Sequence, residues 1–402
     1  LYSWYLQSPE YRILVKKLTE ASFSERPSDK IGKTVAKILY GEISPYSATR
    51  LERFAACAFA HFLQYGLKVT ERAEYEFRAM DMGNVMHMAL EKFAAEVRKE
   101  GLDWAELTEE ERNRIIDSCL NQVSADYGNT ILKSSARNEY MIERTRRILR
   151  RTVWALQEQL KHGAFRPEGF EVRFQGGRID RVDIMEEPEN NRVYVKVIDY
   201  KTGNTSFDLL ALYHGLQLQL MVYLDGALQV EKRKYPDREI VPAGVFYYNV
   251  KDPMIQEKIH ADMESINEQM LKKMKMNGLV QADDNMSTKI DSTMASIPVS
   301  LNRDGSFSKR SSVASRKQFD ALGAYVRRKI CDIRESILDG NAAVEPYELG
   351  KKNACTYCPY LTVCGFDRKI PGYEFHRLSS IEEDALWKKI MKGEEENGSE
   401  MD

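Results

Sequence analysis

The chain has 402 residues, of which 43% are hydrophobic and 30% are charged, which is enough for one large domain or two with a sizeable core. Its formal net charge of −2 at pH 7 argues against a protein that binds nucleic acid through an overall basic surface. Neither a signal peptide nor a run of about 20 apolar residues is recognisable, so the sequence does not suggest secretion or a membrane span.

The first part of the chain, residues 1–43, is predicted to be helical. Because it does not start with methionine, we expect a piece of a longer protein, with this helical segment leading from a missing upstream region. Gly32-Lys33-Thr34 resembles the end of a phosphate-binding loop, but Pro27 stands where that loop needs a glycine. We therefore expect no nucleotide site here, and any motor activity should belong to missing sequence or to a partner.

Helical patterns dominate residues 71–161. One of these helices begins at Gly83 and carries His87 and Glu91 four residues apart, on one face. A single histidine on a helix is more often a surface or core residue than a ligand. His87 is therefore a weak signal when it is taken alone.

Two strand-like runs follow at 170–184 and 193–200, joined by a predicted turn. Such a hairpin can bring Asp180 beside Asp199, and Lys201 points to the same side of its strand as Asp199 because side chains alternate. Two carboxylates suit a hard cation such as Mg²⁺, and a neighbouring lysine can orient a nucleophile or stabilise charge on a phosphate. Two acids and a lysine in this order also occur by chance, in which case the segment is a surface hairpin with ordinary charges.

Downstream, residues 214–223 are predicted to form a helix in which Gln219 and Tyr223 lie one turn apart. Polar amides in so apolar a run need a hydrogen-bonding reason to be there. A buried strand, a long loop and a long helix are predicted next, at 243–250, 283–315 and about 316–338. Basic stretches at 144–151 and 308–317 can follow a DNA backbone, although a solvated helix face explains any single arginine as well.

The chain has six cysteines: Cys57, Cys119, Cys331, Cys355, Cys358 and Cys364. The last three form a C-x2-C-x5-C pattern, which in a reducing compartment favours a metal or an iron–sulfur cluster over disulfides. Three thiolates need a fourth ligand for a four-cysteine site, and Cys57 is our candidate. Cys119 and Cys331 have apolar, helix-forming neighbours and are predicted to be buried thiols. The spacing alone suits tetrahedral zinc equally well.

In chain order, the motifs G-x3-H-x2-L-E, G-x-I-D, D-Y-K and Q-x3-Y resemble the RecB-family nucleases of the PD-(D/E)xK superfamily, over residues 44–367. The resemblance implies an α/β fold: a restriction-endonuclease-like mixed sheet with helices on both sides. It also implies that His87, Asp180 and Asp199 bind Mg²⁺, with the carbonyl of Tyr200 as a further ligand.

By the same resemblance, Lys201 is the catalytic lysine, and Gln219 and Tyr223 form a supporting motif near the DNA. Gln217 is also available, so the register of this last motif is open. Asp183 departs from the family pattern as a second acid on the hairpin. It lies three residues beyond Asp180 and should point to the opposite face, so we rank it well below Asp180.

One cysteine before the nuclease motifs and three after them resemble the iron–sulfur nucleases, which include AddB-type helicase–nuclease subunits and CRISPR-associated exonucleases. The resemblance implies a [4Fe–4S] cluster on Cys57, Cys355, Cys358 and Cys364. The cluster would staple the ends of a nuclease domain at 44–375. Residues 376–402 are then expected to form a C-terminal helix and an acidic, disordered tail.

As a member of this family, the chain would be a Mg²⁺-dependent deoxyribonuclease of the bacterial cytoplasm. It would cut single-stranded DNA, on the strand ending in 5′, while an AddA-type helicase–nuclease partner processes double-strand breaks for recombinational repair. Two alternatives stay open: a stand-alone CRISPR-associated iron–sulfur exonuclease, and a silent nuclease fold used as a DNA-binding module.

Overall fold

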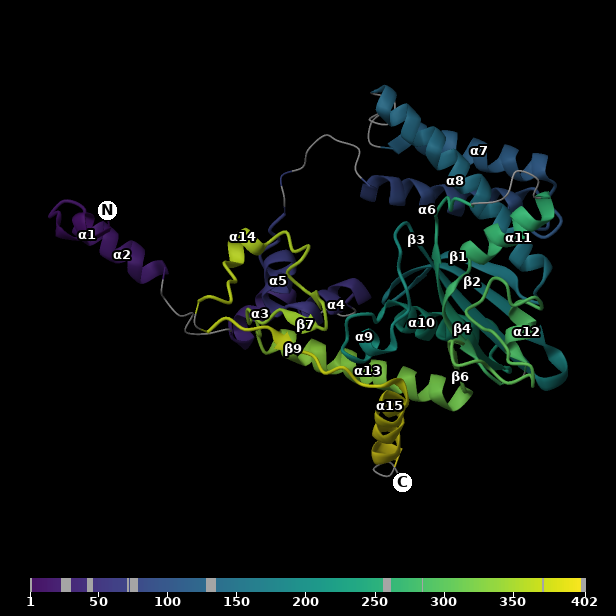
Figure 1. Ribbon diagram of the computed structural model, residues 1–402. Coiled ribbons are helices and arrows are strands. Elements are labelled where there is room, and N and C mark those ends of the chain that lie inside the picture. The colour runs from purple at the N-terminus through teal and green to yellow at the C-terminus, as the bar shows by residue number, and fades with distance from the viewer. Residues whose placement is uncertain are drawn as a thin grey trace. The chain divides into compact units, whose positions relative to one another are not determined.

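The computed structural model describes residues 2–22, 30–41, 46–70, 72, 79–127, 135–255, 262–283, 285–370 and 372–398. The chain forms two compact units that interleave along the sequence (Figure 1). Unit 1 comprises Leu1–Glu71, His214–Leu216 and Arg328–Glu382, and unit 2 comprises Arg72–Tyr213, Gln217–Arg327 and Glu383–Asp402. The sequence-based division at 1–43, 44–375 and 376–402 follows chain order instead, and it stays a prediction about functional domains.

Unit 2 is built on a six-stranded mixed sheet in the order β1-β2-β3-β4-β5-β6. Its strands are β1 (Arg166–Phe174), β2 (Gly177–Glu187), β3 (Arg192–Lys201), β4 (Glu239–Asn249), β5 (Asn277–Gln281) and β6 (Val313–Ala314). Neighbouring strands are antiparallel except for β3 with β4 and β5 with β6, which are parallel. The predicted mixed α/β fold is therefore confirmed.

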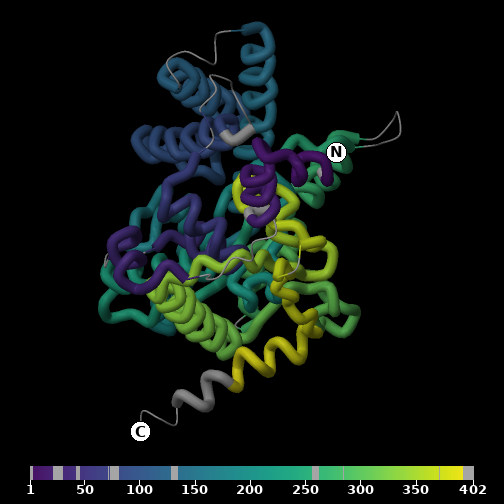
Figure 2. Tube along the Cα trace, turned by 90° about the vertical axis from the view of Figure 1, so that its left-hand side faces the viewer, coloured from purple at the N-terminus to yellow at the C-terminus, as the bar shows by residue number. Residues whose placement is uncertain are grey.

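Helices cover both faces of this sheet. One face packs against α6 (Ala79–Lys99), α7 (Glu109–Asp126) and α8 (Ala136–Lys161), which Figure 2 shows as a layer of their own. Ile198 and Tyr200 of β3 belong to the core on this face. Because side chains alternate along a strand, Lys201 points to the other face of the sheet. There it contacts α10 (Gln219–Lys234), which packs on that face.

The remaining helices of unit 2 are α9 (Leu209–Tyr213), α11 (Met263–Lys273), α12 (Met286–Ile290) and α15 (Glu383–Gly398). Helix α13 (Arg316–Leu338) runs from unit 2 into the residues of unit 1. The predicted long helix is thus confirmed with its bounds. No helix in the described ranges is both long and apolar enough to span a membrane.

Unit 1 brings together segments from both ends of the chain. It contains α1 (Tyr2–Gln7), α2 (Arg12–Ser22), α3 (Lys33–Tyr40), α4 (Ala48–Ala56), α5 (Ala58–His61), a π-helical turn (Phe62–Gly66) and α14 (Leu361–Cys364). A small sheet in the order β8-β7-β9 joins β8 (Lys352–Asn353), β7 (Tyr347–Leu349) and β9 (His376–Arg377). Backbone hydrogen bonds from Ile31 to Gly340 and from Phe59 to Ala343 tie the two ends together.

Two local predictions were wrong. The run at 170–184 is two strands, because the chain reverses at Gly176, where a Cβ would lie only 2.5 Å from the Phe174 ring. The helix expected over 214–223 begins at Gln219 instead, since Gly215 adopts a φ of +80° that a helix does not allow. The expected C-terminal helix is α15, which runs to Gly398, and the disorder of the acidic tail stays a prediction.

A buried ion-pair network cross-links β2 and β3 on the face under α6–α8. Arg181 donates two hydrogen bonds to Asp183, at 2.6 and 2.9 Å, and Lys196 lies 3.0 Å from the same carboxylate. Burial alone would raise the pKa of Asp183, but the two cations outweigh it and hold that pKa below its ordinary value. The prediction that Asp183 faces away from Asp180 is therefore confirmed.

Removing one member of this network should be costly. We expect Asp183→Ala to lower the stability of the protein by about 3–5 kcal/mol, because it leaves two buried cations without their anion. Glu268→Ala removes an exposed acid paired with Lys272 and should cost less than about 1 kcal/mol. Urea denaturation of both variants measures the difference, and equal costs would show that the network contributes no more than a surface pair.

Candidate active site

The β2–β3 hairpin places the two predicted acids side by side. Arg181 pairs with Ile198 in the ladder, so the preceding and following residues, Asp180 and Asp199, lie opposite each other. Both carboxylates are buried, with 9% and 2% of the residue exposed. The Tyr200 N–H donates a 2.7 Å hydrogen bond to Oδ2 of Asp180, which fixes this side chain against the backbone of β3.

Lys201 is held between the hairpin and α10. Its Nζ lies 2.6 Å from Oδ2 of Asp199 and donates a 2.7 Å hydrogen bond to Oε1 of Gln219. The amide nitrogen of Gln219 in turn donates to the Tyr223 hydroxyl at 2.9 Å. Gln217 instead bonds to the backbone of residues 206 and 208, so Gln219 is the glutamine that contacts the lysine.

His87 reaches the same carboxylates from α6. Its Nδ1 lies 3.4 Å from Oδ2 of Asp180. Gly83, one turn earlier, lets the helix approach the end of β3, since a Cβ there would lie 3.3 Å from Oγ1 of Thr202. Burial lowers the pKa of His87, but Asp180 and Asp199 outweigh burial and raise it above its ordinary value. The raised pKa of the imidazole thus reflects a strongly negative site.

Glu171 on β1 is a fourth member of the site, which sequence reasoning missed. Its carboxylate, a ring nitrogen of His87 and a carboxylate oxygen of Asp180 all lie within 4.8 Å of one another. Glu171 stands opposite Asp180 in the β1–β2 ladder and has a strained φ of +50°. With one strand expected over 170–184, this pairing could not be predicted, because only the turn at Gly176 brings Glu171 opposite Asp180.

The acids repel one another in a way that suits a cation. Burial and the charge of Asp180 raise the pKa of Asp199 to about 7, although Lys201 opposes the rise. Burial and Asp180 likewise raise the pKa of Glu171 to about 7, against the effect of Arg178. Oδ2 of Asp199 is buried and accepts no well-aligned hydrogen bond. Carboxylate oxygens and an imidazole are ligands that divalent cations bind, so these residues fit a metal ion.

Four cysteines gather separately, within unit 1. Cys57, Cys355, Cys358 and Cys364 line one cavity, and Cys57 and Cys358 pack against the same buried cluster, which contains Tyr360. Burial, together with the other three thiols, raises the pKa of Cys355 to about 11. Burial, together with the Cys358 and Cys364 thiols, also raises the pKa of Cys57. These two thiols therefore resist ionisation unless a cation stabilises the thiolate.

The other two cysteines lie outside this cluster. Cys119 is buried in the core under α6–α8, as predicted. Cys331 is exposed on α13, so the prediction that it is buried was wrong. Its apolar sequence neighbours belong to a different face of the helix.

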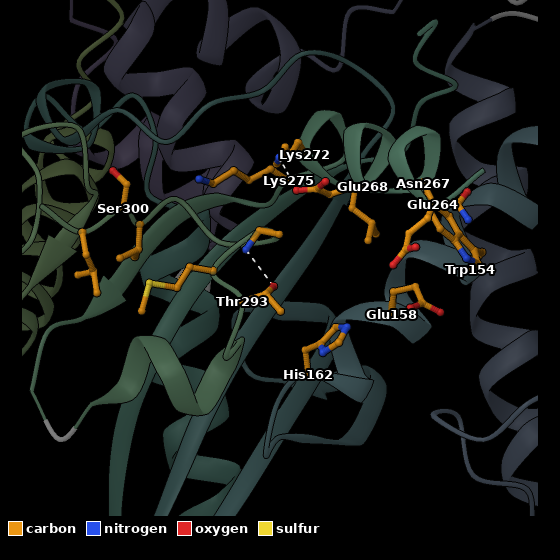
Figure 3. Close-up of a pocket in the computed structure, with 15 residues that line it drawn as sticks. Trp154, Glu158, His162, Glu264, Asn267, Glu268, Lys272, Lys275, Thr293 and Ser300 are labelled. Atoms are coloured by element: carbon orange, nitrogen blue, oxygen red, sulfur yellow. Dashed lines mark hydrogen bonds and ion pairs between the residues drawn. The ribbon is translucent and has the colours of Figure 1, made fainter. Parts of the chain in front are cut away.

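The basic stretch at 144–151 is a face of α8 whose arginines are largely paired with acids. Arg150 pairs with Asp117, and Arg147 and Arg151 both pair with Asp252. Their positive charge is therefore partly neutralised. Residues of α8, α11 and the 293–301 segment also line a large cavity, which contains acids as well as lysines and none of the predicted site residues (Figure 3).

Comparison with known proteins agrees with this arrangement. Residues 45–365 match the family model described as the PD-(D/E)XK nuclease superfamily. The chain is 40% identical over 405 residues to an ATP-dependent helicase/deoxyribonuclease subunit of Lachnoclostridium phytofermentans, an alignment that covers 96% of this chain and 35% of that protein. The proteins of the same name from Alkaliphilus metalliredigens and Thermoanaerobacter sp. are 35% and 33% identical over 98% and 100% of the chain. The chain spans a little over a third of these relatives.

Cation binding at the carboxylates should depend on pH. A carboxyl whose pKa is higher in the folded than in the unfolded protein destabilises the fold as pH rises towards that pKa, here about 7 for Asp199 and Glu171. A bound cation offsets this loss of stability. At lower pH, protons compete with the cation for the same carboxylates.

We therefore expect Mn²⁺ to raise the melting temperature more at about pH 8 than at about pH 6. Glu171→Gln should reduce this difference, and Glu268→Gln, which changes an exposed acid, should leave it unchanged. Differential scanning fluorimetry gives the comparison. An equal Mn²⁺ effect at both pH values would contradict the assignment.

Proposed function

The chain belongs to the PD-(D/E)XK nuclease superfamily, and from this premise we propose that it is the metal-dependent nuclease region of an AddB-type helicase–nuclease. The observation that carries the proposal is the joint placement of Asp180, Asp199 and Lys201 on one face of the β2–β3 hairpin. A structural hairpin has no need to bury two repelling carboxylates beside a lysine.

In this proposal His87, Asp180, Asp199 and the carbonyl of Tyr200 bind Mg²⁺, and Glu171 adds a further carboxylate. The bound cation would acidify a water molecule and offset charge that develops on the phosphate. These residues lie on α6, β1, β2 and β3, and together they would hold the cation beside Lys201. Preorganised groups of this kind stabilise charge without having to reorganise during the reaction.

Lys201 has the position of the catalytic lysine. The side-chain oxygen of Gln219 accepts a hydrogen bond from the Lys201 ammonium group. The hydrogen bond from Gln219 to the Tyr223 hydroxyl keeps Gln219 in that orientation. Fixed in this way, the ammonium group can donate a hydrogen bond to the attacking water or to a phosphate oxygen. Its charge then stabilises the negative charge that builds up as the phosphodiester is cleaved.

The substrate and the partner follow from the relatives. They are named as helicase/deoxyribonuclease subunits, which supports DNA as the substrate and an AddA-type protein as the partner. We propose that the chain cuts single-stranded DNA, on the strand ending in 5′, while the helicase unwinds broken ends for recombinational repair.

We further propose that the four cysteines of unit 1 hold a [4Fe–4S] cluster. Cys57 and the other three cysteines are separated by about 300 residues, so shared ligation closes a very long loop and constrains the unfolded chain. Four thiolates without histidine satisfy this cluster. They also satisfy zinc, which metal analysis distinguishes.

Replacement of the lysine should separate catalysis from binding. We expect Lys201→Ala to reduce the rate of DNA cleavage in Mg²⁺ by roughly 10² or more, while DNA binding changes little. Lys272→Ala removes an exposed lysine of α11 and serves as the matched control. Cleavage and binding of a labelled single strand are measured on the same preparations. Undiminished cleavage by Lys201→Ala would sink the catalytic assignment, and wild-type protein that binds DNA without cutting it would indicate a silent module.

Metal analysis of anaerobically purified protein tests the cluster. We expect brown protein with about four iron atoms per chain, a colour that Cys358→Ala removes and Cys331→Ala retains. Colourless wild-type protein with one zinc per chain would contradict the cluster but leave the nuclease site intact.

A further inference from the structure

One arginine contacts the cysteine cluster directly. Arg53 lies on α4, one turn before Cys57, and its Nη2 is 3.8 Å from Sγ of Cys358. Its guanidinium carbon lies 5.6 Å from the centre of the Tyr360 ring, over its face. Tyr360 is buried, and its hydroxyl donates to the carbonyl of Val69 at 3.0 Å. The arginine is thus held between α4 and the cysteine loop rather than extended into solvent.

The charge of Arg53 has no carboxylate partner within the described residues, and its Nε is buried without a hydrogen bond. Arg50, one turn earlier on the same helix, differs. It donates to His61 at 3.2 Å and stacks 4.0 Å from the centre of the Tyr46 ring. A desolvated, incompletely bonded cation is costly unless something negative lies beside it. The Cys358 sulfur, 3.8 Å from Nη2 of Arg53, carries a negative charge when its thiol is ionised.

We propose that Arg53 is a positioning residue of the metal cluster: it donates an N–H···S hydrogen bond to the Cys358 thiolate and stabilises the cluster in its more negative, reduced state. The inference rests on the proposed [4Fe–4S] cluster. Hydrogen bonds to the sulfurs and nearby charge are among the factors that set the reduction potential of such clusters. Groups that orient ligands in this way also strengthen metal binding, typically by about 10–100-fold.

Substitution of Arg53 in the full chain tests this role. Arg53→Met removes the charge but keeps an apolar stem that can pack on Tyr360. Arg53→Gln replaces the charged group by a neutral polar one. Arg53→Lys keeps the charge. Dithionite titration followed by electron paramagnetic resonance gives the midpoint potential, and a ferrous chelator gives the rate of iron loss. Lys33→Gln removes a positive charge from the same unit, where Lys33 pairs with Asp339, and is the control.

We expect both neutral variants to have a lower midpoint potential and to lose iron about tenfold faster or more, with Arg53→Lys restoring most of both properties and Lys33→Gln matching the wild type. If one neutral variant fails to fold, the other provides the comparison. Wild-type potential and iron loss in a folded neutral variant would overturn the inference while leaving the cluster in place. Zinc in the wild-type protein would instead remove the proposed cluster, and the inference with it.

Discussion

The pairing of β2 with β3 is the constraint on which the candidate active site depends, because it holds together carboxylates that repel one another. The ladder sets Asp180 opposite Asp199, and the Tyr200 N–H prevents Asp180 from turning away. On the reverse face, the ion pair between Lys196 of β3 and Asp183 of β2 links the same two strands. Burial and this repulsion together raise the pKa of Asp199 and Glu171, and a bound cation would offset both effects.

Both units place a group of acidic side chains next to side-chain cations, but the acidic groups differ. Unit 2 gathers carboxylates and sets Lys201 and Arg178 against them, whereas unit 1 gathers thiols and sets Arg53 against one of them. In each case side-chain cations offset only part of the charge that full ionisation would create. Oxygen donors select a hard ion such as Mg²⁺, and sulfur donors select iron or zinc. On the proposed assignments, the two sites would therefore hold different metals.

Local periodicity was enough to predict much of this arrangement. Alternation along a strand placed Asp199 and Lys201 on one face and Asp183 on the other, and the structure confirms both. Features that depend on a turn or on a tertiary partner were not predicted. Glu171, for example, joins the site only because the chain reverses at Gly176. The acids that neutralise the arginines of α8 are distant in sequence, and the exposure of Cys331 depends on which face of α13 is covered.

The most direct test of the central claim is to locate the cation itself. A crystal of the protein soaked in Mn²⁺ gives an anomalous signal that marks the ion independently of any activity. The account predicts a peak within coordination distance of His87, Asp180 and Asp199, about 2.0–2.3 Å from their ligand atoms, with Lys201 beside it. A fully occupied Mn²⁺ elsewhere, with these side chains still bonded only to one another, would contradict it.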